Sequence, residues 1–315
     1  MTNQRSQRHV AIVLGSNDVG SAVACALHGA GWSVVLVDEA DPPWHRRGMA
    51  FTNAWYMGNA ELDGAGACFC ASLKSIPSVL AHGMIAATTW SWGSVADALH
   101  AEVLVDAGRS RRRPEVLRGR VPITIGIGPD FAAGENVDVA VEAPAEIAGV
   151  DPLPTRGRDE AALWSRRKSY VVASTRYGRF MTERRIGDSV RAGDRIGSIG
   201  TETVAAPASG VLLGLAARGA RIEPGDELVE VDTCGVPYRC HGIGEGPRSV
   251  AALVLAIVAN TADSVNAAVA RTVLAESVAA ASTQSQSPFL SEALGTPASG
   301  AATDERSAGR PVIGP

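Results

Sequence analysis

The sequence predicts an α/β fold for its first half and a small β-barrel for its second half. The first observation is an apolar run, Val10 to Leu14, that ends in Gly15 and is followed by a polar turn and an alanine-rich helical pattern. The second is another β-type run, residues 32–37, which ends in Asp38. The third is a change near residue 166 to short strands and turns. Strand, tight turn and helix in this order are typical of a Rossmann-like dinucleotide-binding unit.

The glycine turn matches the dinucleotide fingerprint G-x-G-x-x-G only in part. Gly15 and Gly20 occupy the first and third positions, whereas Asn17 occupies the second. The middle glycine normally lets the backbone approach a pyrophosphate, so the Asn17 side chain is expected to stand where a phosphate would sit. Asp18 would stabilise the helix dipole. The alternative is a structural unit whose pocket has been repurposed or lost.

The second half predicts a flattened barrel of the biotinyl/lipoyl-like hammerhead type. An element of Ile or Val, a Gly-Asp turn and a following Val or Leu occurs twice, at Gly187-Asp188 and at Gly225-Asp226. Carriers of this type hold their prosthetic group on a lysine in an exposed turn. The corresponding turn, residues 200–203, has no lysine, so we expect a structural or docking barrel.

Composition changes along the chain predict the domain organisation. Residues 146–165 contain several prolines and are expected to be a linker. Residues 246–281 are rich in alanine and are expected to form a terminal helix. Residues 282–315, rich in Ser, Ala, Gly, Pro and Thr, are expected to be disordered. The predicted parts are a Rossmann-like nucleotide- or cofactor-binding domain (1–145), a linker (146–165), the barrel (166–245), the helix (246–281) and the tail (282–315).

Charge and hydropathy exclude two classes of partner. The 315-residue chain is 46% apolar with a net charge of −4, so no globally basic surface for nucleic acid is expected. The longest apolar run, residues 250–259, is too short to span a bilayer, and the first nine residues lack the apolar core of a signal peptide. The five cysteines are odd in number and not spaced like a disulfide framework. We therefore expect a cytoplasmic protein.

Ligand-binding residues are expected at the carboxyl ends of the parallel strands. Asp38 would meet a ribose hydroxyl or would simply cap its strand. Arg46 and Arg47 would grip a phosphate bidentately or would be solvated loop residues. No catalytic acid, base or nucleophile and no metal-ligand spacing is recognisable. The predicted cofactor-binding residues are Gly15, Asn17, Asp18, Gly20, Asp38, Arg46, Arg47, Gly126 and Gly128.

Together these stretches resemble the YqeB-type proteins encoded beside selenium-dependent molybdenum hydroxylases, which are often grouped with the xanthine dehydrogenase accessory proteins. The family's GAGDxxxGxA, arginine pair and FSEAVYxG are matched by residues 15–22, 46–47 and 51–58. Its IGLGPGFxAGxDV is matched by residues 125–137, with Asp130 in place of a glycine. Its APxxGVLxGL is matched by residues 206–215.

The resemblance implies an accessory role in the maturation or insertion of the molybdenum cofactor of a hydroxylase. The glycine turn at Gly15, the pair Arg46 and Arg47 and the Gly126 loop predict that the Rossmann-like domain binds a phosphorylated ligand, either a molybdopterin-type cofactor or a nucleotide such as NAD(P). The implied partner is a molybdenum hydroxylase or another maturation factor. Two alternatives remain: an NAD(P)-dependent oxidoreductase that uses Gly15, Gly20 and Asp38, and a non-catalytic scaffold with a degenerate pocket.

Overall fold

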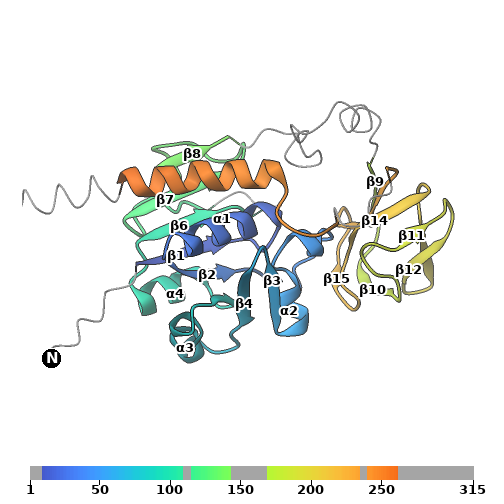
Figure 1. Ribbon diagram of the computed structural model, residues 1–315, viewed down its shortest axis with the longest axis horizontal. Coiled ribbons are helices and arrows are strands. Elements are labelled where there is room, and N and C mark those ends of the chain that lie inside the picture. Colours follow the sequence, from blue (N-terminus) through green and yellow to red (C-terminus); the bar gives the residue numbers. More distant parts are fainter. Residues whose placement is uncertain (1–8, 109–114, 143–168, 235–239, 262–315) are drawn as a thin grey trace, which may run out of the picture. The chain divides into compact units, whose positions relative to one another are not determined.

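The computed structural model describes residues 9–108, 115–142, 169–234 and 240–261. All of them belong to one compact unit, Met1–Ser264, whereas a second unit, Val265–Pro315, lies outside the described residues. The described elements form one eight-stranded sheet and two four-stranded sheets (Figure 1).

The large sheet has the order β3-β4-β5-β2-β1-β6-β7-β8. All of its neighbouring strands are parallel except the pair β3/β4. Its central strands are mostly apolar and rich in Val, Ile, Leu and Ala, as expected for strands that helices cover on both faces. The bounds are β1 Val10–Leu14, β2 Ser33–Val37, β3 Asn59–Leu62, β4 Ala65–Phe69, β5 Ile85–Thr88, β6 Val103–Asp106, β7 Ile123–Ile127 and β8 Val139–Val141.

Helices lie on both faces of this sheet (Figure 1). One hydrophobic cluster joins α1 and the helix over residues 245–261, drawn in orange, to the sheet. The other cluster joins α3 and α4 to the opposite face. The helices are α1 Asp18–Gly29, α2 Asn53–Met57, α3 Ile76–Ala81 and α4 Trp92–Leu99, with short 3-10 turns η1 Arg47–Met49 and η2 Leu73–Ser75.

The two small sheets are antiparallel throughout, with the orders β13-β12-β10-β15 and β11-β14-β16-β9. They share one core that includes Phe180, Leu212 and Val229. The bounds are β9 Ser169–Ala173, β10 Gly178–Thr182, β11 Ser189–Val190, β12 Arg195–Ile199, β13 Glu202–Ala205, β14 Gly210–Leu215, β15 Arg221–Ile222 and β16 Glu227–Asp232.

Aspartates shape the turns between these strands. A carboxylate oxygen of Asp188 accepts a hydrogen bond from the Arg185 amide at 2.9 Å, and Asp226 accepts one from the Glu223 amide at 2.6 Å. Asp194 repeats the arrangement in a third turn. Asp side chains close turns in this way, which is why the Gly-Asp repeat marks reversals of the chain.

The predicted fold class, a Rossmann-like domain followed by a biotinyl/lipoyl-like barrel and a terminal helix, is wrong. The large sheet is mixed, because β3 and β4 form an antiparallel hairpin at its edge. Residues 128–138, which join the parallel strands β7 and β8, contain no helix. The second half forms two separate four-stranded sheets.

The turn of this hairpin consists of Asp63 and Gly64, between β3 and β4. Asp63 has φ 48° and Gly64 has φ 81°, so both central residues are left-handed. A two-residue hairpin loop of type I′ requires this conformation, and Asp-Gly is one of its preferred sequences. The Asp-Gly pair therefore carried the signal for an antiparallel strand.

The predicted domain boundaries stay a prediction. The linker 146–165, the tail 282–315 and residues 262–281 of the expected helix lie outside the described residues. In the described part of the chain, no helix has both the length and the hydropathy that crossing a bilayer requires.

The packing of the helix over residues 245–261 can be tested by comparing two neighbouring side chains. Val254 is fully buried in the cluster with α1, whereas Leu253 is 49% exposed. We expect Val254→Ala to lower the free energy of unfolding by about 2 kcal/mol through lost burial and a residual cavity. Leu253→Ala, the control, should change it by less than about 0.5 kcal/mol. Equal effects in urea unfolding would show that this helix does not pack on the sheet.

Candidate functional site

The turn after β1 lies where the chain order of the large sheet reverses, between β2 on one side and β6 on the other. Gly15 has φ +94°, and its amide donates to the Val37 carbonyl at 2.9 Å. A Cβ at Gly15 would lie 2.9 Å from the Cα of Gly108. Ligands of open α/β sheets bind at such a reversal, so this is the first place to look for a site.

Asn17 caps helix α1. Its Oδ1 accepts from the Gly20 amide at 2.9 Å, and its Nδ2 donates to the Ala107 carbonyl at 2.7 Å. The buried side chain therefore takes up an amide of the turn that a phosphate would otherwise use. Asn is a preferred N-cap residue, so the sequence did carry a signal for this role.

Two further amides of the turn are bound by the chain's own carboxylates. The Ser16 amide donates to Asp38 at 2.6 Å, and the Val19 amide donates to Asp18 at 2.9 Å. A helix N-terminus holds an anion through free amide groups. Here these amides already donate to side-chain carboxyl groups, so a phosphate would have to displace them.

Two carboxylates flank the Gly15 turn. Burial raises the pKa of Asp38, although hydrogen bonds from the Ser16 amide and hydroxyl lower it. Burial also raises the pKa of Asp106, at the end of β6, to about 6, and the nearby charge of Asp38 adds to this. The Gly108 amide, which donates to Asp106 at 2.9 Å, acts in the opposite direction. Such a pair suits hydroxyl or amine groups better than phosphate.

The glycine loop after β7 contains the last two predicted site residues. A Cβ at Gly126 would collide with the ring of Phe131, so this glycine makes room for an aromatic side chain. Gly128 has φ +125°, and its amide donates to the Val141 carbonyl at 3.0 Å. Both glycines are thus explained by packing and backbone conformation, and ligand binding there stays a prediction.

Arg46 points towards strand β16. Its Nε and Nη2 donate to the two carboxylate oxygens of Glu230 at 2.6 Å and 2.8 Å. Its Nη1 lies 3.8 Å from a carboxylate oxygen of Asp18, the first residue of α1. Glu230 is completely buried and Arg46 nearly so. Arg46 therefore joins the start of α1 to the core of a small sheet.

Glu230 has two more partners. His45 Nε2 lies 3.0 Å from its Oε2, and the Ser169 hydroxyl donates to its Oε1. Burial alone would raise the pKa of Glu230, but the hydrogen bonds and charges of His45 and Arg46 outweigh it and hold this pKa well below its usual range. We call Asp18, His45, Arg46, Ser169 and Glu230 the Glu230 cluster.

Strand β14 completes the contact. The Arg47 Nε donates to the Leu215 carbonyl at 2.8 Å, and its Nη1 donates to Asn53. The Leu215 amide in turn donates to the His45 carbonyl at 2.7 Å. A Cβ at Gly214 would collide with the His45 ring, so only glycine lets the strand approach this closely. Burial lowers the pKa of Arg47.

The structure therefore separates the predicted site residues into three groups. Gly15, Asn17, Asp18, Gly20 and Asp38 lie together around the turn after β1. Gly126 and Gly128 follow β7. Arg46 and Arg47 are bound by β16 and β14, although Arg46 also approaches Asp18.

Glu230 was not predicted as a site residue. The signal that could have revealed it is a glutamate within the apolar run of β16. It does not indicate which cation the glutamate would meet.

Two other features do not belong to this site. A hollow of about 260 Å³ lies at the amino ends of β2 and β5, and its lining includes Trp32, Ser33 and Met84. The five cysteines are free thiols, and the described residues contain no cluster of three metal-ligating side chains.

Comparison with curated proteins finds a distant relative. The chain is 23% identical over 255 residues to the uncharacterized protein YqeB of Escherichia coli (strain K12). The match covers 79% of this chain but 47% of the relative, so the chain spans about half of that protein's length. No protein-family profile matches the chain. The resemblance to YqeB is thus supported as a distant similarity.

Comparison with solved structures finds only weak likenesses. A succinylglutamate desuccinylase/aspartoacylase from Rhodobacter sphaeroides is 14% identical, with a TM-score of 0.23 over 71% of this chain and 86% of that one. The minor L-lactate dehydrogenase from Enterococcus mundtii is 13% identical, with a TM-score of 0.22 over 62% and 61%. TM-scores of this size support no functional argument.

The Glu230 cluster makes a prediction about stability. Glu230→Gln keeps the shape of the side chain but leaves the buried Arg46 guanidinium facing a neutral group. We expect the free energy of unfolding to fall by about 3–5 kcal/mol. The control is Glu183→Gln, which removes an exposed ion pair with Arg218 and should cost less than about 1 kcal/mol. Similar losses for both variants in urea unfolding would contradict the importance of the cluster.

Asp106 makes a prediction about pH. Because its pKa in the folded state, about 6, lies above the ordinary value, the folded state binds the proton more tightly. This contribution to stability is complete below the ordinary pKa and is lost as the pH rises through 6. Near pH 7.5 the free energy of unfolding of Asp106→Asn should therefore be about 1–2 kcal/mol higher than that of wild type. Near pH 4 the two should differ little. Asp97→Asn, at an exposed position, should show no such dependence when unfolding is measured across this pH range.

Proposed function

We propose that the chain is an accessory protein in the maturation of a molybdenum hydroxylase and acts by binding its partner rather than by catalysing a reaction. The observation that carries this proposal is the similarity to YqeB over 255 residues. The stretches that resemble the family's motifs lie between residues 15 and 215 of this sequence. The molybdenum-hydroxylase role comes from the resemblance to the YqeB-type family.

The contacts among these motifs support a structural role for several of their residues. The arginine pair, Arg46 and Arg47, binds Glu230 and the Leu215 carbonyl. Leu215 and Gly214 belong to the stretch 206–215 that matches the family's APxxGVLxGL motif. The contacts of the arginine pair and of Gly214 thus hold two of the motifs together. An accessory protein that presents a defined surface would require such a rigid structure.

The proposal is tested in a host that encodes both proteins. Deleting the gene for this chain should lower hydroxylase activity and molybdenum content per mole of purified hydroxylase, while the amount of hydroxylase polypeptide stays unchanged. A reintroduced wild-type gene should restore both quantities. Hydroxylase that is fully active and fully loaded in the deletion strain would refute the proposal.

A second candidate function is binding of a phosphorylated ligand, either a molybdopterin-type cofactor or NAD(P), near the Gly15 turn. The observation that favours it is the convergence of Asp38 and Asp106, whose pKa values are both raised, beside that turn. Perturbed carboxyl groups gather at functional sites. The carboxylates would hold the hydroxyl groups of the ligand, whereas its phosphates would have to compete with Glu230 for Arg46.

Thermal denaturation with NAD(H), NADP(H) or isolated molybdopterin cofactor tests this candidate. A ligand that binds only the folded protein raises its melting temperature. A shift with NAD(H) alone, lost in Asp38→Asn, would favour an oxidoreductase. The absence of a shift with every ligand would favour a scaffold with a degenerate pocket.

A further inference from the structure

One face of the sheet β13-β12-β10-β15 carries positive charge without a matching negative charge. Arg179 on β10 stands directly opposite Arg221 on β15 in the antiparallel register. Directly opposed residues project from the same face, and two like charges in this relation destabilise the pair. The opposed pair of Arg179 and Arg221 is therefore unfavourable for the stability of this sheet.

The acidic groups nearby are engaged elsewhere. Glu183, which shares the outward face of this chain segment with Arg179, forms an ion pair with Arg218. Glu202 on β13 forms one with Arg176. Within the described ranges, no carboxylate lies at ion-pair distance from Arg179 or Arg221, and the Arg179 Nη1 donates only to the Gly219 carbonyl.

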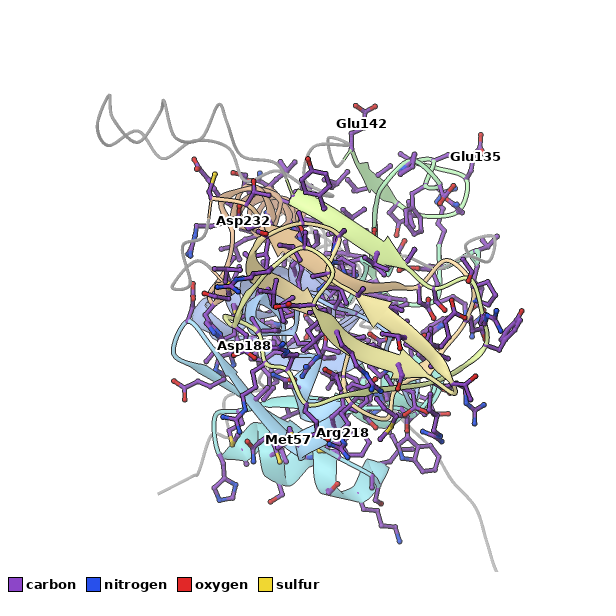
Figure 2. All side chains as sticks on the ribbon, turned by 90° about the vertical axis from the view of Figure 1, so that its right-hand side faces the viewer. Met57, Glu135, Glu142, Asp188, Arg218 and Asp232 are labelled. Atoms are coloured by element: carbon purple, nitrogen blue, oxygen red, sulfur yellow. The ribbon has the colours of Figure 1, made fainter. Side chains whose placement is uncertain are left out.

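Exposed apolar side chains accompany the two arginines. Along the chain, outward residues alternate with inward ones, so that Tyr177, Arg179 and Met181 share one side while Phe180 and Thr182 are buried. Tyr177 is 75% exposed and Met181 is 41% exposed. Figure 2 views the molecule from the side of the two small sheets and labels Arg218 below their strands. Tyr, Met and Arg are the residue types enriched at protein interfaces.

We propose that this face, defined by Tyr177, Arg179, Met181 and Arg221, binds an acidic segment of a partner protein. Carboxylates of the segment would neutralise the two opposed guanidinium groups, since a guanidinium group donates two parallel hydrogen bonds to a carboxylate. Apolar residues of the segment would cover Tyr177 and Met181. The inference rests on the proposed accessory function and names the surface that such a protein would use.

The binding test uses a fluorescein-labelled peptide of alternating glutamate and leucine, with fluorescence anisotropy as the readout. Wild type should bind it, with weaker binding as salt rises. Reversing both charges, Arg179→Glu with Arg221→Glu, should weaken binding at least about tenfold. The matched control, Arg185→Glu with Arg191→Glu, reverses two exposed arginines beside strand β11 of the other small sheet and should leave binding within about twofold.

A second measurement separates binding from folding. Arg221→Glu alone places an opposite charge across from Arg179, so it should raise the melting temperature by about 1–3 °C while it weakens peptide binding. A purely structural role for Arg221 would not move stability and binding in opposite directions. A fall in melting temperature would contradict the inference.

Other outcomes are also decisive. Equal weakening by the control pair, or no binding by wild type, would overturn the inference. Binding of single-stranded RNA that depends on Arg179 and Arg221, without binding of the peptide, would make this a nucleic-acid surface instead.

If the peptide binds as expected but gene deletion leaves the hydroxylase fully active, the inference about the surface stands and the proposed function fails. The converse outcome is that gene deletion impairs the hydroxylase while a reintroduced gene for the Arg179→Glu with Arg221→Glu variant restores its activity as fully as the wild-type gene does. In that case the inference about the surface fails, and the proposed function stands.

Discussion

The buried ion pair between Arg46 and Glu230 is the interaction on which the arrangement of the described residues depends. A carboxylate with no exposed surface is tolerated only when its charge is matched and its oxygens are hydrogen-bonded. Arg46, His45 and Ser169 meet this requirement, and they come from two distant stretches of the chain. Close approach of the strands then demands glycine at position 214, where any Cβ would collide with His45. A single buried charge thus accounts for several residues that would otherwise suggest ligand binding.

At the turn after β1, the chain's own side chains accept the amide hydrogen bonds that an anionic ligand would use. The features of an anion site are present, since a glycine with positive φ leads into a capped helix at the reversal of the sheet. Yet Asn17, Asp18 and Asp38 accept the amide hydrogen bonds that a phosphate would accept. What this edge still offers is a pair of partly buried carboxyl groups. Their raised pKa values make hydroxyl groups better partners here than further negative charge.

The small sheets differ in what they turn inward and outward. Inside, the Glu230 carboxylate is bound by Arg46, His45 and Ser169. Outside, Arg179 and Arg221 are opposed without a carboxylate at ion-pair distance among the described residues. The first arrangement holds the chain together, whereas the second costs some stability and is understandable if another molecule supplies the missing charge. In the accessory role that we propose, the second arrangement would form the binding surface and the first would be the rigid support that presents it.

The sequence by itself determined the local elements, because their causes are local. The apolar runs of β1 and β2, the helix after Gly15 and the Gly-Asp turns each depend on residues a few positions apart, and all appear in the structure. Only the tertiary structure decided how these elements pair: the antiparallel β3/β4 edge, the two small sheets and the return of residues 245–261 to α1. It also decided the roles of Arg46 and Arg47, which the pattern assigned to a phosphate. The sequence places a guanidinium near the turn after β2 but does not say which anion it meets, and Glu230 lies 184 residues further along the chain.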